Sequence, residues 1–174
     1  MSNIGKKKID IPEGISLKFN PILSNIIVGG KLGEIILTLS KEVTISQEKD
    51  QLIVISQNKE LWGTERTRIL NAIIGVSQGF KKSLKLVGIG YRVQKKENSL
   101  IMKLGFSHDV SYELPKGIDA ICPKQDQIIL FGIKKDFLFK IAADIRSLKK
   151  PDSYKGKGIC FEDEKLILKE GKKK

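Results

Sequence analysis

Two lysines, two glycines and a tyrosine alternate in the stretch PDSYKGKG, in the C-terminal third of the chain. The backbone of a nucleic acid is bound by positive charge and by N–H donors, in a groove or on a protruding loop. We expect Gly156 and Gly158 to bring backbone N–H groups close to a phosphate, because they carry no side chain. Lys155 and Lys157 would supply charge on either side, and the ring of Tyr154 would stack on a base or cover a ribose.

The alternative for this stretch is a flexible, soluble loop after a helix, with incidental lysines. Positive charge on both sides favours the nucleic-acid interpretation: Lys149 and Lys150 come just before it, and the chain ends in KEGKKK. A lysine-rich end is by itself ambiguous. Lys165, Lys169 and residues 172–174 could form a solvated, disordered extension or one that folds on RNA.

Chemistry of other kinds has no comparable support. His108 is the single histidine, and no Ser-His-Asp or Cys-His pattern surrounds it. The acidic run at 162–164 is typical of a solvated turn, and the glycines of LVGIGYR lie inside a strand pattern, without the helix that a dinucleotide fingerprint requires. Cys122 and Cys160 have neither metal-binding nor redox spacing. We therefore expect no enzyme, no metal, no cofactor and no small-molecule substrate.

Charge is distributed unevenly along the chain. The net charge is +12, of which residues 1–60 carry only +1, residues 61–133 carry +5 and residues 134–174 carry +6. A charge of this size suggests a polyanionic partner, either nucleic acid or an anionic membrane, and the gradient indicates that the partner binds to the second half. No apolar run approaches the roughly 20 residues of a membrane span, and the first residues lack the apolar core of a signal peptide.

Two segments have the periodicity of amphipathic helices. In GTERTRILNAIIGVSQGF we expect Gly63-Thr64 to begin the helix and Gly79 to end it, with Arg66 and Arg68 exposed on its first turns. In KKDFLFKIAADIRSLKK, Asp136 is the expected N-cap. These are the elements that must position the PDSYKGKG loop, which directly follows the second helix.

The remaining ordered segments have strand patterns, separated by turn sequences such as GGKLG, QEKD, KKEN and PKQD. Five strands are expected before the first helix and five between the helices: Ser16–Phe19, Ile26–Val28, Gly33–Leu39, Val43–Gln47, Gln51–Ser56, Ser83–Gln94, Ser99–Gly105, Val110–Leu114, Asp119–Cys122 and Gln127–Ile133.

Strands followed by one helix therefore occur twice. VTISQEKDQLIVIS and DAICPKQDQIILFG share an Asp-Gln pair followed by an apolar run, and each lies shortly before its helix. We interpret this as an internal duplication. It predicts an α+β fold of two tandem domains, residues 1–81 and 82–174, each an antiparallel sheet covered by one helix.

Four ordered blocks carry a resemblance to a known family. PDSYKGKGI is similar to the signature of large-ribosomal-subunit protein six, the bacterial-type "L-six" family, possibly in an organellar member. GTERTRILNAIIGVSQGFKKSLKLVGIGYRV resembles the family's central stretch, IGKKKIDIPEGI its N-terminus and KLGFSHDV its mid-domain turn. The resemblance implies two duplicated α+β domains and binding to large-subunit rRNA, mostly by the C-terminal domain. It also implies a position near the sarcin-ricin loop, the base of the stalk and the site where translational GTPases bind. Other large-subunit ribosomal proteins near the stalk base would be its neighbours.

The resemblance places the rRNA contacts in the PDSYKGKG loop and the basic tail, supported by residues at the end of the second helix. The implied rRNA-binding residues are Arg146, Lys149, Lys150, Ser153, Tyr154, Lys155, Gly156, Lys157, Gly158, Lys169, Lys172, Lys173 and Lys174. The chain departs from the family where Cys160, Phe161 and KLIL replace a run that commonly includes Arg and Tyr. A short strand within 160–168 is the alternative to RNA contact there.

The expected function is that of a structural constituent of the large subunit, in the ribosomes of a bacterial cytoplasm or an organelle. Recognition would be of phosphate, 2′-OH and shape, because the chain has no base-reading module. The alternatives are an RNA-binding protein or RNA chaperone outside the ribosome, an enzyme of unknown class, for which the sequence supplies no set of catalytic residues, and a peripheral membrane protein, for which no basic amphipathic helix is present.

Overall fold

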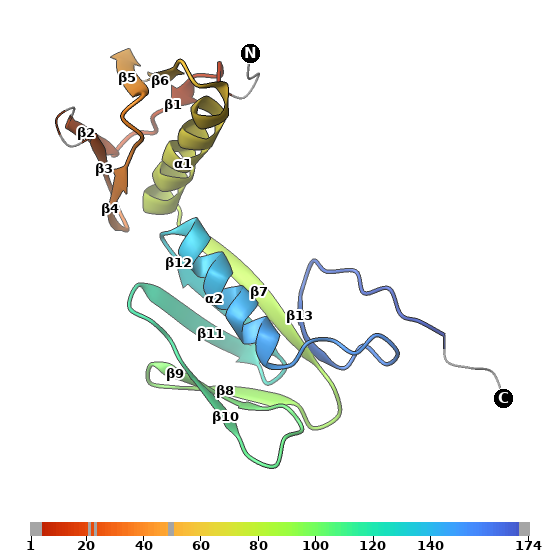
Figure 1. Cartoon of the computed structure of the whole chain (residues 1–174). Coiled ribbons are helices and arrows are strands. Elements are labelled where there is room, and N and C mark those ends of the chain that lie inside the picture. The colour runs from red at the N-terminus through yellow and green to blue at the C-terminus, as the bar shows by residue number, and fades with distance from the viewer. Residues whose placement is uncertain (1–4, 21, 23, 49–50, 171–174) are drawn as a thin grey trace. The chain divides into compact units, whose positions relative to one another are not determined.

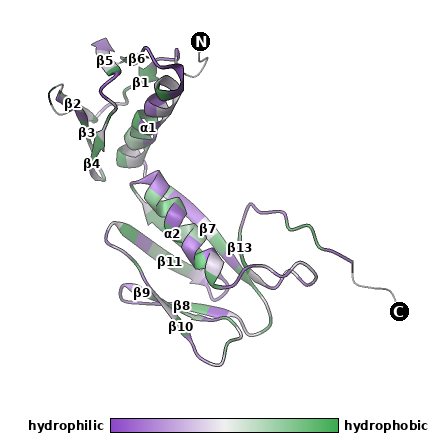
Figure 2. Ribbon diagram, in the orientation of Figure 1, coloured by the Kyte–Doolittle hydropathy of each residue, from purple (hydrophilic) through white to green (hydrophobic). Residues whose placement is uncertain are grey.

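The computed structural model describes residues 5–20, 22, 24–48 and 51–170. The chain divides into two compact units. The first, here the N-terminal unit, comprises residues up to Phe80 together with Ile133–Lys135, and the second, the C-terminal unit, comprises Lys81–Gly132 and the residues from Asp136 onward. Figure 1 shows one long helix in each unit, and along both helices hydrophobic and hydrophilic residues alternate (Figure 2).

The N-terminal unit packs helix α1 (Lys59–Ser77) against two three-stranded sheets. Their orders are β1-β6-β5 and β2-β3-β4, and all pairings are antiparallel. The core is aliphatic, since buried side chains of α1 such as Ile69 and Ile73 meet Val28 and Val54 of the sheets. The strands are β1 (Ile9–Asp10), β2 (Ser16–Asn20), β3 (Asn25–Gly30), β4 (Gly33–Thr38), β5 (Val43–Glu48) and β6 (Gln51–Ser56).

Helix α1 begins earlier than the sequence predicted. Its N-cap is Asn58, whose side-chain oxygen accepts a hydrogen bond of 3.1 Å from the N–H of Glu60, so Gly63-Thr64 lies inside the helix. The expected end is correct. The helix ends at Ser77 with Gln78 as its C-cap, and Gly79 comes next with a φ of 74°, its N–H donating to the carbonyl of Gly75.

Of the two arginines of α1 that were expected to be exposed, Arg66 is buried and Arg68 is half-exposed. Arg66 is only 8% exposed, and its guanidinium donates to the carbonyls of Lys7 at 2.7 Å and Lys8 at 3.2 Å. Arg68 pairs at 2.9 Å with Glu65, which is itself buried. Arg66 therefore fixes the segment that leads into β1, while Arg68 forms an ion pair within its own helix.

The C-terminal unit packs helix α2 (Lys135–Leu148) across the four-stranded sheet β11-β12-β7-β13 (Figure 1). A second sheet has the order β10-β9-β8 and is an antiparallel meander. Asp136 lies in the first turn of α2 instead of preceding it. The strands are β7 (Phe80–Val87), β8 (Arg92–Lys96), β9 (Ser99–Lys103), β10 (Val110–Glu113), β11 (Ile118–Lys124), β12 (Gln127–Gly132) and β13 (Gly158–Phe161).

Three strand assignments differ from the sequence predictions. The segment expected as one strand over Ser83–Gln94 is divided into β7 and β8 by a turn in which Gly90 has a φ of 77°. The glycines of LVGIGYR therefore break the strand. The short β1 was not predicted. Strand β13 lies partly in the region where a strand was the alternative to RNA contact, and it pairs antiparallel with β7.

The internal repeat is visible in the structure. In each unit a β-hairpin precedes the helix, β5–β6 before α1 and β11–β12 before α2. The same offset of 76 residues separates the starts of β6 and β12, at Gln51 and Gln127, and the starts of the two helices, at Lys59 and Lys135. The predicted α+β fold with a repeated helix-on-sheet arrangement is confirmed, with the strands of each unit divided between two sheets.

Candidate nucleic-acid interface

The PDSYKGKG loop connects the end of α2 to β13 and is closed by its own backbone. The N–H of Asp152 donates to the carbonyl of Lys157, and the N–H of Gly156 donates to the carbonyl of Asp152, both at 2.9 Å. The Asp152 carboxylate accepts a third bond, also of 2.9 Å, from the N–H of Lys155. Just outside the loop, the N–H of Ile159 donates to the carbonyl of Lys149, which joins β13 to the helix end. The loop therefore has a defined shape without a ligand.

The two glycines act differently from the sequence expectation. Gly156 is buried with a φ of 67°, and its N–H is already used within the loop, so it is not offered to a phosphate. A Cβ at Gly158 would lie 2.7 Å from the carbonyl oxygen of Lys150 and from backbone atoms of Pro151. Both glycines therefore let the loop close tightly. Whether either contacts RNA stays a prediction.

The side chains at the tip of the loop point outward. Ser153, Tyr154, Lys155 and Lys157 are exposed, and Tyr154 keeps 58% of its surface accessible. A fixed backbone that presents two ammonium groups and a phenol ring suits the surface of an RNA, because little conformational freedom remains to be lost on binding.

The segment after β13 returns to this loop. The N–H of Lys169 donates to the carbonyl of Ser153 at 2.8 Å, and the side chains of Leu166 and Leu168 lie against Gly156. Lys169 therefore lies beside the loop, close to the other residues predicted to bind rRNA. Lys172, Lys173 and Lys174, the remaining predicted tail residues, lie outside the described residues.

Arg146 is engaged inside the protein. Its guanidinium forms two hydrogen bonds with the Glu164 carboxylate, one of them 2.9 Å from Nε, and lies 5.6 Å from the centre of the Phe161 ring. These hydrogen bonds raise the pKa of Arg146 and lower the pKa of Glu164. In this position Arg146 anchors the segment after β13 to helix α2, and its charge is partly neutralised by Glu164.

The two lysines that end α2 have different surroundings. Lys150 is exposed. Lys149 is half-buried, and its ammonium lies 4.5 Å from the centre of the Phe106 ring. Phe106 belongs to the loop between β9 and β10. Phe106 in turn stacks with His108, at 6.4 Å between ring centres. Neither of these aromatic residues belongs to the site predicted from the sequence.

Lys82 is a further positioning residue that sequence reasoning missed. Its side chain is only 15% exposed and pairs with Asp163 at 2.7 Å. Its ammonium also lies 4.8 Å from the ring centre of Phe161 and 5.4 Å from that of Phe139. Because Lys82 and Asp163 are 81 residues apart, no local sequence signal could have paired them. Together with Arg146, Lys82 fixes the segment that leads back to the loop.

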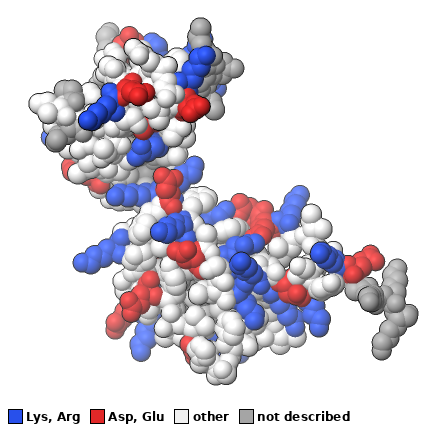
Figure 3. Space-filling view, viewed as in Figure 1, with Lys and Arg blue, Asp and Glu red and all other residues white. Residues whose placement is uncertain are grey.

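Charge gathers around these elements in the folded chain. In Figure 3, Lys and Arg side chains cluster on the C-terminal unit over β13 and the segments on either side of it, interspersed with acidic groups. Two acidic residues of the segment after β13 belong to the internal pairs just described, Glu164 with Arg146 and Asp163 with Lys82. The loop lysines 155 and 157 are thus presented on a surface where two of the nearby carboxylates, Glu164 and Asp163, are paired internally.

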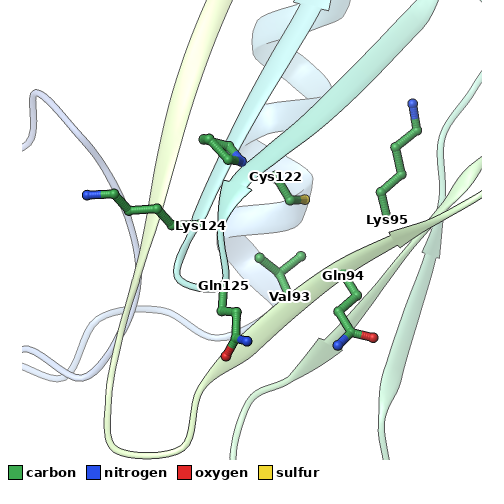
Figure 4. Close-up of a pocket in the computed structure, with 7 residues that line it drawn as sticks. Val93, Gln94, Lys95, Cys122, Lys124 and Gln125 are labelled. Atoms are coloured by element: carbon green, nitrogen blue, oxygen red, sulfur yellow. The ribbon is translucent and has the colours of Figure 1, made fainter.

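Other kinds of site have little support. A shallow hollow of about 510 Å³ is lined by Val93, Gln94, Lys95, Cys122, Pro123, Lys124 and Gln125. Figure 4 shows Lys95 and Lys124 extending to opposite sides of it. Burial raises the pKa of the Cys122 thiol, which disfavours the nucleophilic thiolate.

Neither a metal site nor a membrane span is found in the described residues. In the described part of the chain, no three His, Cys, Asp or Glu side chains are grouped so that they could hold a metal ion. No helix within those same residues is long and apolar enough to cross a bilayer. The loop after α2 and its surroundings are accordingly the strongest candidate site.

Comparison with known proteins gives matches over the whole chain. The sequence model described as "Ribosomal protein L6" matches residues 87–162, which include β13 and the loop before it. The large ribosomal subunit protein uL6 of Bordetella parapertussis is 38% identical, and those of Magnetococcus marinus and Vibrio cholerae are each 42% identical. In all three cases the alignment covers 100% of both chains.

Proposed function

The chain belongs to the ribosomal protein L6 family of the large ribosomal subunit, and from this premise we propose that its loop at 151–158 binds large-subunit rRNA. The family consists of structural ribosomal proteins, and this chain is not an enzyme. Binding positions the C-terminal unit on the RNA through phosphate and 2′-OH contacts, with Lys155 and Lys157 as the principal charges and Tyr154 as a stacking surface.

The observation that carries this proposal is the closed backbone of the loop. Its internal hydrogen bonds hold the exposed side chains of Tyr154, Lys155 and Lys157 on one tip, and the bond from Lys169 to Ser153 adds a further lysine beside them. Lys150 extends the basic surface at the end of α2. A preformed basic surface of this kind recognises a folded RNA by its shape and its backbone.

The position within the subunit is part of the same proposal. The family resemblance supports contact near the sarcin-ricin loop and the stalk base, with ribosomal proteins as neighbours and translational GTPases binding nearby. At that position the protein stabilises the RNA fold on which those factors act. The proposed location is the ribosome, of a bacterial cytoplasm or of an organelle.

A binding experiment tests the role of the loop. Replacing both Lys155 and Lys157 with Ala removes two exposed charges, and we expect weaker binding to deproteinised large-subunit rRNA. The slope of log K against log salt should flatten by about one to two units, since each lost phosphate contact contributes roughly 0.7 to 0.9. Filter binding at several salt concentrations measures both effects.

The matched control replaces Lys31 and Lys41, two exposed lysines of the N-terminal unit, with Ala. It lowers the net charge by the same amount but leaves the loop intact, so its affinity and slope should stay close to those of the wild type. An unchanged salt slope in the loop variant, or equal losses in the two variants, contradicts the proposal.

A further inference from the structure

We propose that Phe106 and His108, together with Lys149, form a second RNA contact, a platform on which an unpaired base stacks. This inference rests on the proposed function, since it assigns a further contact to the same RNA partner. It concerns residues of the loop between β9 and β10, which are distant in sequence from PDSYKGKG.

The geometry of the three side chains resembles that of a base-stacking site. Phe106 and His108 lie nearly parallel, with 23° between their ring planes and 6.4 Å between their centres. The ammonium of Lys149 lies 4.5 Å from the centre of the Phe106 ring. Even with these two neighbours, Phe106 is 44% exposed, and His108 is exposed as well.

The loop that carries these rings is held in place from several sides. At the start of the loop Leu104 is fully buried. Across the base of the loop, Lys103 Nζ lies 3.9 Å from Asp109 Oδ2. Gly105 has a φ of 75°, and a Cβ there would lie 3.3 Å from the ring of Tyr91. An outward-pointing Phe on a loop fixed in this way keeps its ring in water at a cost in free energy, which stacking on a base would recover.

Lys149 connects the Phe106 and His108 rings to the loop at 151–158. Lys149 contacts Phe106 with its ammonium and accepts the N–H of Ile159 with its carbonyl, on the far side of the PDSYKGKG loop. The platform is therefore linked to the surface that holds Tyr154 and its flanking lysines.

An aromatic pair with an adjacent ammonium suits RNA better than it suits a protein or a lipid. Unstacked bases of RNA loops and bulges are bound on aromatic rings, while a neighbouring lysine neutralises the phosphate of the same nucleotide. Stacking on a ring also tolerates any base, which agrees with the absence of a base-reading module in the sequence. The partner is thus an unpaired nucleotide next to the RNA helix held by the 151–158 loop.

Phe106→Leu tests the inference, because it keeps an apolar side chain and removes the ring. Loss of one stacked base should weaken binding to deproteinised large-subunit rRNA by between about 5-fold and 150-fold, with the salt slope unchanged because no charge is removed. Phe19→Leu is the matched control: Phe19 is 37% exposed, nearly as much as Phe106, but it lies on β2 of the N-terminal unit. It should bind as the wild type does.

A second variant reports on stacking directly. In Phe106→Trp the introduced indole should be quenched when the rRNA is added, against the constant background of Trp62 in the N-terminal unit, and affinity should stay near that of the wild type. Unchanged affinity of Phe106→Leu, or an indole at position 106 that the RNA does not quench, overturns the inference. If Phe106 fails these tests while the Lys155 and Lys157 double variant binds weakly with a flatter slope, the proposed function stands without the platform.

Discussion

At the scale of single residues, the glycines of the loop carry the strongest structural constraint. Gly158 packs its α-carbon against the backbone of Lys150 and Pro151, where a Cβ would approach to 2.7 Å. Gly156 occupies the left-handed region beneath Leu168. Neither glycine needs an RNA to explain its presence, because each is required for the loop to close. The residues free to contact RNA are those between and beside them.

Gly158→Ala should therefore destabilise the C-terminal unit. The neighbours of the new methyl group are backbone atoms, which cannot move aside as a side chain would, so we expect a loss of about 1–3 kcal/mol in the free energy of unfolding. Urea denaturation of the full chain measures this loss. Gly117→Ala is the control: its φ is also positive, at 89°, but nothing lies within 4 Å of the new Cβ. Equal losses in the two variants would contradict the steric explanation.

At the scale of elements, α2 and the segment after β13 are joined by side chains far apart in the sequence. Arg146 on the helix holds Glu164, and Lys82 on β7 holds Asp163. Both carboxylates follow β13, and their fixation returns the chain toward the PDSYKGKG loop, where Lys169 binds Ser153. The internal ion pairs thus position the loop at 151–158 without belonging to it.

The Arg146–Glu164 pair makes this anchoring dependent on pH. The pKa of Glu164 is lowered in the folded chain, chiefly by its hydrogen bonds from Arg146, so the pair stabilises the fold above the ordinary Glu pKa and loses its effect as pH falls through the lowered value. At pH 7, Glu164→Gln should unfold with a free energy about 0.5–1 kcal/mol below that of the wild type.

This difference should shrink as the pH falls from about 5 towards 3, because the wild-type carboxylate becomes protonated. Denaturant titrations of both chains across this range measure it. A difference that stays constant from pH 7 to pH 3 would show that the charge of Glu164 contributes nothing.

Much of the element order could be predicted from the sequence. Alternating and helical patterns located ten strand segments and two helices, because each depends on neighbouring residues. The start of α1 was placed too late, since Asn58 is an N-cap whose signal was weaker than that of Gly63-Thr64. The internal repeat indicates the correct start of α1, because Lys59 lies 76 residues before Lys135, where α2 begins. Pairing of β13 with β7 could not be predicted, since about 75 residues separate the partners.

The candidate site was predictable only in its local part. The lysines and the tyrosine at 154–157 could be proposed from the sequence because their types and spacing suit RNA, and their contact with RNA stays a prediction. The internal role of Arg146, the buried Arg66 and the platform at Phe106 depend on contacts across the fold, with Glu164, Lys7 and Lys149 respectively. A sequence pattern gives the charge of such a side chain but not its partner.

At the scale of the whole molecule, most of the excess positive charge and the candidate RNA-binding loop lie in the same unit, the C-terminal one. The first 60 residues are nearly neutral, and the C-terminal unit contains the loop, the end of α2 and the segment after β13. In the N-terminal unit a buried arginine and glutamate serve the core and the first strand. The duplication thus supplied two similar scaffolds, of which the second carries the basic surface.

The central claim, that the 151–158 loop lies on large-subunit rRNA, is tested most directly by cross-linking within native ribosomes. A photoreactive benzoylphenylalanine in place of Tyr154 retains an aromatic ring at the exposed tip of the loop. After irradiation, primer extension on the purified RNA should show stops in large-subunit rRNA, close to the sarcin-ricin loop. Cross-links confined to proteins or to small-subunit RNA would contradict the account.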